Sequence, residues 1–191
     1  MIMSTLFGTF AAVAQDTKEL TILYWQAASI VNVYLSGGTK DQDAMALVTE
    51  PLAAVDPDGQ FVLKLATEIP TVDNGGVVHT EDSTTMTWHL RDDVLWSDGT
   101  PVTSADVVFT WEYCTNEETG CAYVDRFDNI ASVEADGDYA IVITYDTFKP
   151  YPYDAFVGHT TPIIQKAQFA DCVGAAAQSC TEQNFAPIGT G

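Results

Sequence analysis

The alternation of hydrophobic and polar residues is clearest in the middle of the chain. Met86, Trp88 and Leu90 alternate with polar neighbours, the period of two that is typical of a half-buried strand. Asp98-Gly99 then predicts a tight turn, because Gly accepts positive φ at no steric cost and Asp tolerates it.

A helix is predicted directly after that turn. Thr103 can cap its first turn, and Asp106 stands three residues further on, as a capping box requires. Val107, Trp111 and Cys114 fall on one face of this helix, with Val108 beside them.

Shorter apolar runs predict two hairpins. Residues 52–55 and 61–65 flank the turn sequence Asp-Pro-Asp-Gly, and residues 130–145 carry a second turn at Asp136-Gly137. The run at residues 20–25 is almost continuously apolar, which predicts a strand buried on both faces.

Another helix is predicted to begin at Thr39, with Gln42 completing a capping box and Ala44, Leu47 and Val48 facing inward. Other segments are predicted as follows: surface loop at 73–83, polar loop at 115–120, short strand then helix at 161–170, and small loops at 171–186. The sum is an α/β fold with mixed, mostly antiparallel short strands from about residue 40 to 187.

The charge balance excludes some classes of partner. The 191 residues include 27 acidic and 7 basic residues, a formal net charge of −20. Nucleic acids and anionic membranes need basic patches, so neither is an expected partner. The acidic residues are scattered, which favours a solubilising surface over an attraction for cationic ligands, the alternative reading. No apolar run of 18 residues follows the start of the chain.

The start of the chain has features of a signal peptide. Residues 1–14 are apolar and small, Ala12-Val13-Ala14 fits a cleavage site, and Gln15 would begin the mature protein. A basic first segment is missing, and a structureless or helical N-terminal tail is the alternative. No lipobox cysteine is found there.

The cysteines suit an exported protein. Four cysteines allow three pairings, and the two local ones need no long-range geometry. We therefore predict the disulfides Cys114–Cys121 and Cys172–Cys180.

Motifs for catalysis and metal binding are weak or missing. His79, His89 and His159 lack the spacing of zinc ligands, and a nucleophile elbow is absent. The sequence thus predicts neither an enzyme nor a metal site nor a cofactor.

The central stretch WHLRDDVLWSDGTPVTSADVVFTWEY resembles the signature of the family 5 extracytoplasmic solute-binding proteins of ABC importers. The resemblance extends upstream through GTKDQDAMALVTEPLAAVDPDGQFVLKLATEIP, and downstream through VITYDTFKPYPYDAF to PIGTG. It implies a fold like that of periplasmic binding proteins with an extra subdomain, in which the signature is mostly core.

The resemblance also implies a domain division. Residues 15–39 would begin lobe one, 40–187 would form the inserted α/β subdomain, and 188–191 would start the return to lobe one. The second lobe would be absent, so that the chain would be an N-terminal fragment. Residues 20–32 are then expected to expose apolar surface.

In the family, the loop after the first strand lines the ligand cleft. The residues of this chain that match that loop are Trp25, Gln26, Ala27, Ala28, Ser29 and Asn32. Trp25 could cover a ligand, while Gln26 and Asn32 could pair with peptide amides. Trp25 could equally be the last core residue of the strand. Tyr123, Asp125 and Arg126 match cleft-facing positions more loosely, and a solvated loop is the alternative for them.

The function implied by the resemblance is capture of an oligopeptide-like solute outside the cytoplasmic membrane, in the periplasm. The protein would act as a monomer and deliver the solute to the permease and ATPase subunits of the importer. Nickel chelates and oligosaccharides are other solutes of the family. An exported enzyme, or a binding module without a transport role, on the same scaffold is the alternative function.

Overall fold

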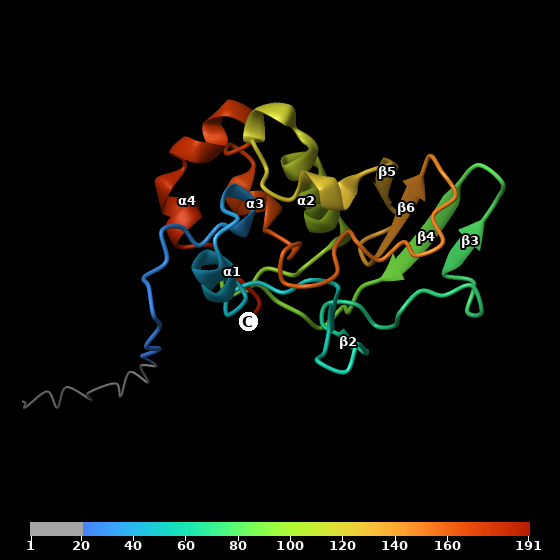
Figure 1. The fold of residues 1–191 in the computed structure, drawn as a ribbon, viewed down its shortest axis with the longest axis horizontal. Helices are drawn as coiled ribbons and strands as arrows, with labels where there is room; N and C mark the ends of the chain where they lie inside the picture. Colours follow the sequence, from blue (N-terminus) through green and yellow to red (C-terminus); the bar gives the residue numbers. More distant parts are fainter. Residues whose placement is uncertain (1–20) are drawn as a thin grey trace, which may run out of the picture.

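The structure, a computed structural model, describes residues 21–191 (Figure 1). The predicted signal peptide, its cleavage site and Leu20 lie outside the described residues. The strands are β1 (Ala53–Val55), β2 (Phe61–Leu63), β3 (Val77–His79), β4 (Thr84–His89), β5 (Ile130–Ala135) and β6 (Ala140–Tyr145). The helices are α1 (Thr39–Met45), α2 (Ser104–Thr115), α3 (Lys166–Phe169) and α4 (Thr181–Phe185). Short 3-10 helices are η1 (Val33–Leu35), η2 (Glu117–Thr119), η3 (Val124–Phe127) and η4 (Gly174–Ser179).

Four strands form one antiparallel sheet in the order β3-β4-β6-β5, and β1 pairs with β2 in a separate antiparallel hairpin. The four-stranded sheet lies at one end of the molecule and α1, α3 and α4 at the other, with α2 between them (Figure 1). The mixed content of helix and strand agrees with the predicted α/β class, and both predicted hairpins are confirmed.

The core joins the four-stranded sheet to the capped helix α2. Met86 and Trp88 of β4 lie opposite Ile143 and Ile141 of β6, and all four side chains are buried. Val107 and Cys114 of α2 are buried in the same cluster, and Trp111 packs against it half-buried. The buried face of β4 and the apolar face of α2 therefore belong to one core, in which α2 lies against β5 and β6.

The start of α2 confirms the predicted capping box. Thr103 is the N-cap, and its backbone N–H donates to Asp106 Oδ2 at 2.9 Å. The Asp106 carboxylate is buried and also accepts hydrogen bonds from Trp96 Nε1 and from the backbone N–H of Lys166. One cap thus joins α2 to the preceding turn and to α3.

The strand predicted at residues 20–25 is wrong for its described part. Residues 21–25 have no strand conformation and are exposed, with Leu23 92% exposed. A strand needs a neighbour to accept its backbone hydrogen bonds, and residues 21–28 form no backbone–backbone hydrogen bond within the described chain.

The capping box predicted at Thr39 is also wrong. Gly38 is the N-cap of α1, and no side chain caps it. The buried residues of α1 are Asp41 and Met45, and Leu47 lies beyond the helix and is 57% exposed. The helix is therefore rotated relative to the prediction, because a polar residue, Asp41, occupies its inner face.

Smaller corrections concern the loops. Residues 73–83, predicted as a loop, contain β3, and residues 115–120 contain η2. Residues 161–165 form no strand in the structure, although the predicted helix follows as α3. The small loops predicted at 171–186 contain η4 and α4.

Both predicted disulfides are present. The Cα atoms of Cys114 and Cys121 lie 5.1 Å apart, and those of Cys172 and Cys180 lie 5.9 Å apart. The two disulfide loops also contact each other, since the backbone N–H of Gly174 donates to the buried Thr119 Oγ1 at 2.9 Å.

Candidate functional site

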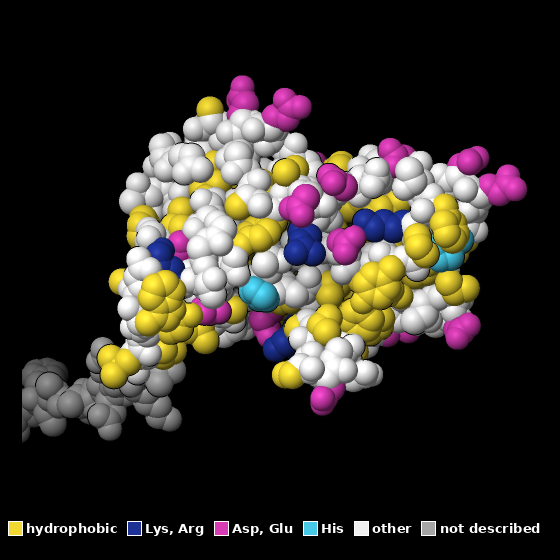
Figure 2. All heavy atoms as spheres, viewed as in Figure 1, with side chains coloured by type: hydrophobic (Ala, Val, Ile, Leu, Met, Phe, Trp, Pro, Cys, Tyr) yellow, Lys and Arg dark blue, Asp and Glu magenta, His cyan; other side chains and the backbone are white. Residues whose placement is uncertain are grey.

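A hollow of about 570 Å³ lies between the N-terminal described segment and helix α1. The residues that line it are Ile22, Leu23, Tyr24, Gln26, Ala27, Ala28, Lys40, Asp43, Ala44 and Leu47. Hydrophobic side chains gather at this end of the molecule, next to the start of the described chain (Figure 2). Three residues of the predicted binding loop, Gln26, Ala27 and Ala28, therefore lie in the wall of one hollow.

The two charged residues in the wall of the hollow are already partnered. Lys40 Nζ donates to Asp41 Oδ1 at 2.7 Å and to the Ser29 hydroxyl. The Asp43 carboxylate accepts a hydrogen bond from the Tyr24 hydroxyl. With these charges engaged, the surface that the hollow offers is predominantly apolar.

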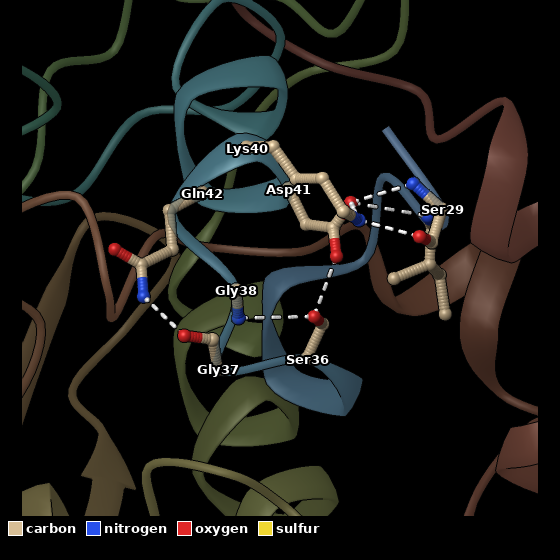
Figure 3. Close-up of polar contacts among 8 residues, drawn as sticks. Ser29, Ser36, Gly37, Gly38, Lys40, Asp41 and Gln42 are labelled. Atoms are coloured by element: carbon tan, nitrogen blue, oxygen red, sulfur yellow. Dashed lines mark hydrogen bonds and ion pairs between the residues drawn. The ribbon is translucent and has the colours of Figure 1, made fainter. Parts of the chain in front are cut away.

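Asp41 connects the loop before α1 to the helix (Figure 3). Its side chain is 2% exposed, and Oδ1 accepts the backbone N–H of Ser29 at 2.7 Å and of Ile30 at 3.4 Å. Oδ2 accepts the Ser36 hydroxyl at 2.6 Å. Together with Lys40, four donors thus surround one carboxylate, as a buried charge requires.

The same contacts set the ionisation of Asp41. Burial alone raises the pKa of this carboxyl, but the hydrogen bonds from Lys40, Ser36 and the two backbone amides outweigh it and lower the pKa below its ordinary value. Asp41 is therefore a carboxylate at neutral pH.

Trp25 lies at the edge of this region without lining the hollow. Its side chain is 71% exposed, and its ring lies 5.8 Å from the ring of Tyr24. Trp25 is therefore not a core residue of the described chain, and its indole is accessible to a ligand or to another protein surface.

Asn32 holds the loop from inside. It is buried, its Nδ2 donates to the Tyr113 hydroxyl at 3.0 Å and to Asn184 Oδ1 at 2.9 Å, and its Oδ1 accepts the Tyr34 backbone N–H. Burial raises the pKa of Tyr113 to about 12, and the hydrogen bond from Asn32 opposes that rise. Both N–H donors of the Asn32 amide are used within the protein, so its contribution to a site is to fix the loop.

Tyr123 and Asp125 lie on another side of α1. The Tyr123 hydroxyl accepts a hydrogen bond from Gln42 Nε2, and Gln42 Oε1 lies 3.3 Å from His159 Nε2. Burial raises the pKa of Tyr123, while the Gln42 hydrogen bond lowers it in part. Asp125 and Arg126 are exposed, and Arg126 Nε lies 4.0 Å from Asp125 Oδ2. The structure therefore does not bring Tyr123 and Asp125 into the hollow with Gln26.

Lys40 and Asp41 are the site residues that the sequence did not reveal. An acidic residue in the first turn of a helix is common and suits the helix dipole, so it does not by itself indicate a buried ion pair. The signal that could have pointed to Asp41 is the serine five residues before it, Ser36, within reach of the helix start.

The described residues offer no donor set for a metal. Between residues 21 and 191, no group of three or more His, Cys, Asp or Glu side chains could hold a metal ion. No helix in that range has both the length and the hydropathy to cross a membrane.

The family is shown by the match of residues 60–191 to the model described as "Bacterial extracellular solute-binding proteins, family 5 Middle". The match covers more than half of the chain, so the chain belongs to this family of non-enzymatic solute-binding proteins, as its central stretch indicates.

Two relatives illustrate the sequence similarity. The periplasmic oligopeptide-binding protein OppA of Escherichia coli (strain K12) is 30% identical over 104 residues, which are 46% of this chain and 19% of that protein. Protein XP55 of Streptomyces lividans is 29% identical over 151 residues, which are 78% of this chain and 25% of that protein. The chain thus spans a quarter or less of the length of these two relatives.

Solved structures share the fold. The oligopeptide-binding protein AppA of Bacillus subtilis, in complex with a nonapeptide, matches with a TM-score of 0.68 and 23% identity, over 86% of this chain and 31% of that chain. NikZ of Campylobacter jejuni, in complex with Ni(L-His), matches with a TM-score of 0.68 and 24% identity, over 87% and 30%. The chain therefore shares its fold with part of each of these two solved proteins.

Proposed function

We propose that this protein is the substrate-binding subunit of an ABC importer, which captures an oligopeptide-like solute outside the cytoplasmic membrane and delivers it to the permease. The observation that carries the proposal is the family match over residues 60–191. The similarity to the oligopeptide-binding protein OppA favours peptides over the nickel complex that NikZ binds, because that similarity is seen in the sequence itself.

The hollow beside α1 is the proposed solute-contact surface of this chain. Its apolar wall suits the side chains of a peptide, and the exposed indole of Trp25 could cover them. Gln26 carries an amide that can both donate to and accept from a peptide backbone. Binding of this kind needs no covalent step and no cofactor.

The proposed mechanism is closure of two lobes around the solute. Contacts made only in the closed state shift the population towards that state, and the permease recognises it. Residues 15–39 and 188–191 are proposed to belong to lobe one, and residues 40–187 to the subdomain inserted in it. Tyr123 and Asp125 lie outside the hollow, so we propose for them the solvated loop rather than a contact with the solute.

Export of the protein follows from the same proposal. The relatives include a periplasmic protein, and the family is described as extracellular. We propose that residues 1–14 are a signal peptide and that the mature protein works in the periplasm.

Uptake measurements test the function directly. Deletion of the gene that encodes this chain should reduce the uptake of a radiolabelled tri- to hexapeptide library by the source organism, and a plasmid copy should restore it. Suppose instead that peptide uptake is unchanged in the deletion strain, while a hydrolytic activity found in the medium or periplasm of the wild type is missing. This result would support an exported enzyme.

A further inference from the structure

We propose that the Lys40–Asp41 ion pair is the positioning element of the solute site. It would set solute affinity by holding residues 26–30 against α1, without itself contacting the solute. This inference rests on the proposed function for its effect on affinity, and on the geometry of the described residues for the rest.

Apart from the ion pair with Lys40, the contacts of the Asp41 side chain are directed at the loop that leads from the hollow to the helix. The backbone amides of Ser29 and Ile30 and the hydroxyl of Ser36 donate to it. Ser29 directly follows the wall residues Gln26 to Ala28, so the position of that wall is determined at Asp41.

Lys40 joins the hollow to this carboxylate. It lines the hollow, yet its side chain is only 13% exposed, because its ammonium group bridges Asp41 and the Ser29 hydroxyl. Ser29 is therefore hydrogen-bonded by both residues: its backbone N–H donates to Asp41, and its hydroxyl accepts from Lys40 (Figure 3).

The saturation of these groups distinguishes positioning from direct binding. The lysine is neutralised by the aspartate, and both aspartate oxygens already accept hydrogen bonds. If a solute formed an ion pair with Lys40 or with Asp41, the other charged group would stay buried without a partner, which is unfavourable in free energy. Loss of the pair should therefore change affinity by displacing the wall of the hollow.

Gly38 leaves little room for movement of the carboxylate. A Cβ atom at this position would lie 3.2 Å from Asp41 Oδ2 and 3.4 Å from Ser36 Oγ. Gly38→Ala thus pushes the carboxylate without a change of charge, and it complements Asp41→Asn and Lys40→Met. Lys64→Met is the matched control, because Lys64 forms a 3.3 Å ion pair with Glu50 away from the hollow.

Two measurements decide the proposal. Amide hydrogen exchange of the purified chain should become about tenfold faster at Ser29 and Ile30 in Asp41→Asn and Lys40→Met, and stay unchanged in Lys64→Met. In cells, the same two variants should raise the KM of peptide uptake about tenfold, with the maximal rate per molecule of protein unchanged once abundance is measured. Gly38→Ala should shift KM in the same direction by a smaller factor.

The outcomes separate the inference from the function it rests on. Unchanged exchange at Ser29, or faster exchange with an unchanged KM, would overturn the positioning role. If deletion of the gene leaves peptide uptake intact, the proposed function fails. In that case the predicted effect of the ion pair on solute affinity fails too. The hydrogen-exchange measurement then decides only whether the Lys40–Asp41 pair holds residues 26–30 in place. Lys40→Met keeps the test valid if Asp41→Asn does not fold.

Discussion

At the scale of single residues, Asp41 shows how a charge can be buried at a helix start. Its lowered pKa means that ionised Asp41 stabilises the folded state. That stabilisation is fully present above the unfolded pKa of about 3.9 and is lost as the pH falls through the lower folded pKa.

We therefore expect Asp41→Asn to lower the free energy of unfolding by about 2 kcal/mol at pH 7. The difference from the wild type should shrink as the pH falls below about 4, since the unfolded wild-type chain then takes up a proton at Asp41 that the folded protein binds only at lower pH. Urea unfolding of both proteins between pH 7 and pH 2 measures this. Asp58→Asn, at an exposed turn position, is the control, and a difference that does not vary with pH would contradict the assigned charge.

Asn32 and Asp41 mark the limit of what single residues reveal in a sequence. The sequence does not distinguish a buried asparagine whose amide is hydrogen-bonded within the protein from one whose amide faces a ligand. Its partners Tyr113 and Asn184 are 81 and 152 residues away. Side chains brought together over such distances carry no local pattern, so the family resemblance placed the candidate loop but not the role of each residue in it.

At the scale of elements, the cap of α2 has more connections than a helix cap needs. Asp106 accepts hydrogen bonds from Thr103, from Trp96 and from the start of α3. We expect Asp106→Ala to lower stability by about 3 kcal/mol, because the buried Trp96 indole and two part-buried backbone N–H groups lose their acceptor. Thr103→Ala should cost about 1 kcal/mol, the usual value for a cap. Thermal unfolding of both variants checks this, and equal losses would contradict the wider role of Asp106.

The two disulfide loops form the second prediction at this scale. Each closes a short loop, with sequence separations of 7 and 8 residues, so replacing either cysteine pair by serine should cost about 2 kcal/mol. Because Thr119 of one loop accepts a hydrogen bond from Gly174 of the other, the two losses should not add when both pairs are removed. Denaturant unfolding of the single-pair and double-pair variants measures the coupling, and strict additivity would contradict it.

Elements with local signals could be predicted, and elements that depend on distant partners could not. The alternation in β4, the capping box of α2 and the turns of both hairpins act within a few residues, and all are confirmed. The strand at residues 21–25 and the inner face of α1 depend on what packs against them. Apolar content alone therefore misassigned both.

At the scale of the whole molecule, the segment at residues 22–25 exposes four large apolar side chains in a row. Ile22, Leu23, Tyr24 and Trp25 are each about half exposed or more. Apolar surface of this kind favours association. We expect self-association of the purified chain to fall in the double variant Leu23→Ser, Trp25→Ser, with little loss of stability because neither side chain is buried. Analytical ultracentrifugation measures this, with Val72→Ser, another exposed apolar residue, as control.

The openness of the hollow leads to an expectation about affinity. Ligand sites usually bury about 70–90% of a small ligand's surface. Here residues 22–24 and 26–28 form one wall and α1 the other, while the outer edge of the segment is exposed. We therefore expect the 191-residue chain by itself to bind oligopeptides more weakly than micromolar, because the open side of the hollow leaves much of a peptide's surface in water.

Calorimetric titration of the purified chain with a library of tri- to hexapeptides measures this affinity, with Escherichia coli OppA as the positive control. Weak or undetectable heats for the chain, beside clear binding by OppA, would agree with a site that needs a second surface. Micromolar or tighter binding by the chain would show that the hollow beside α1 is sufficient, and closure of two lobes would then be unnecessary for capture of the solute. In that case Asp41→Asn should weaken the calorimetric affinity directly, since the wall that it holds would provide most of the contacts.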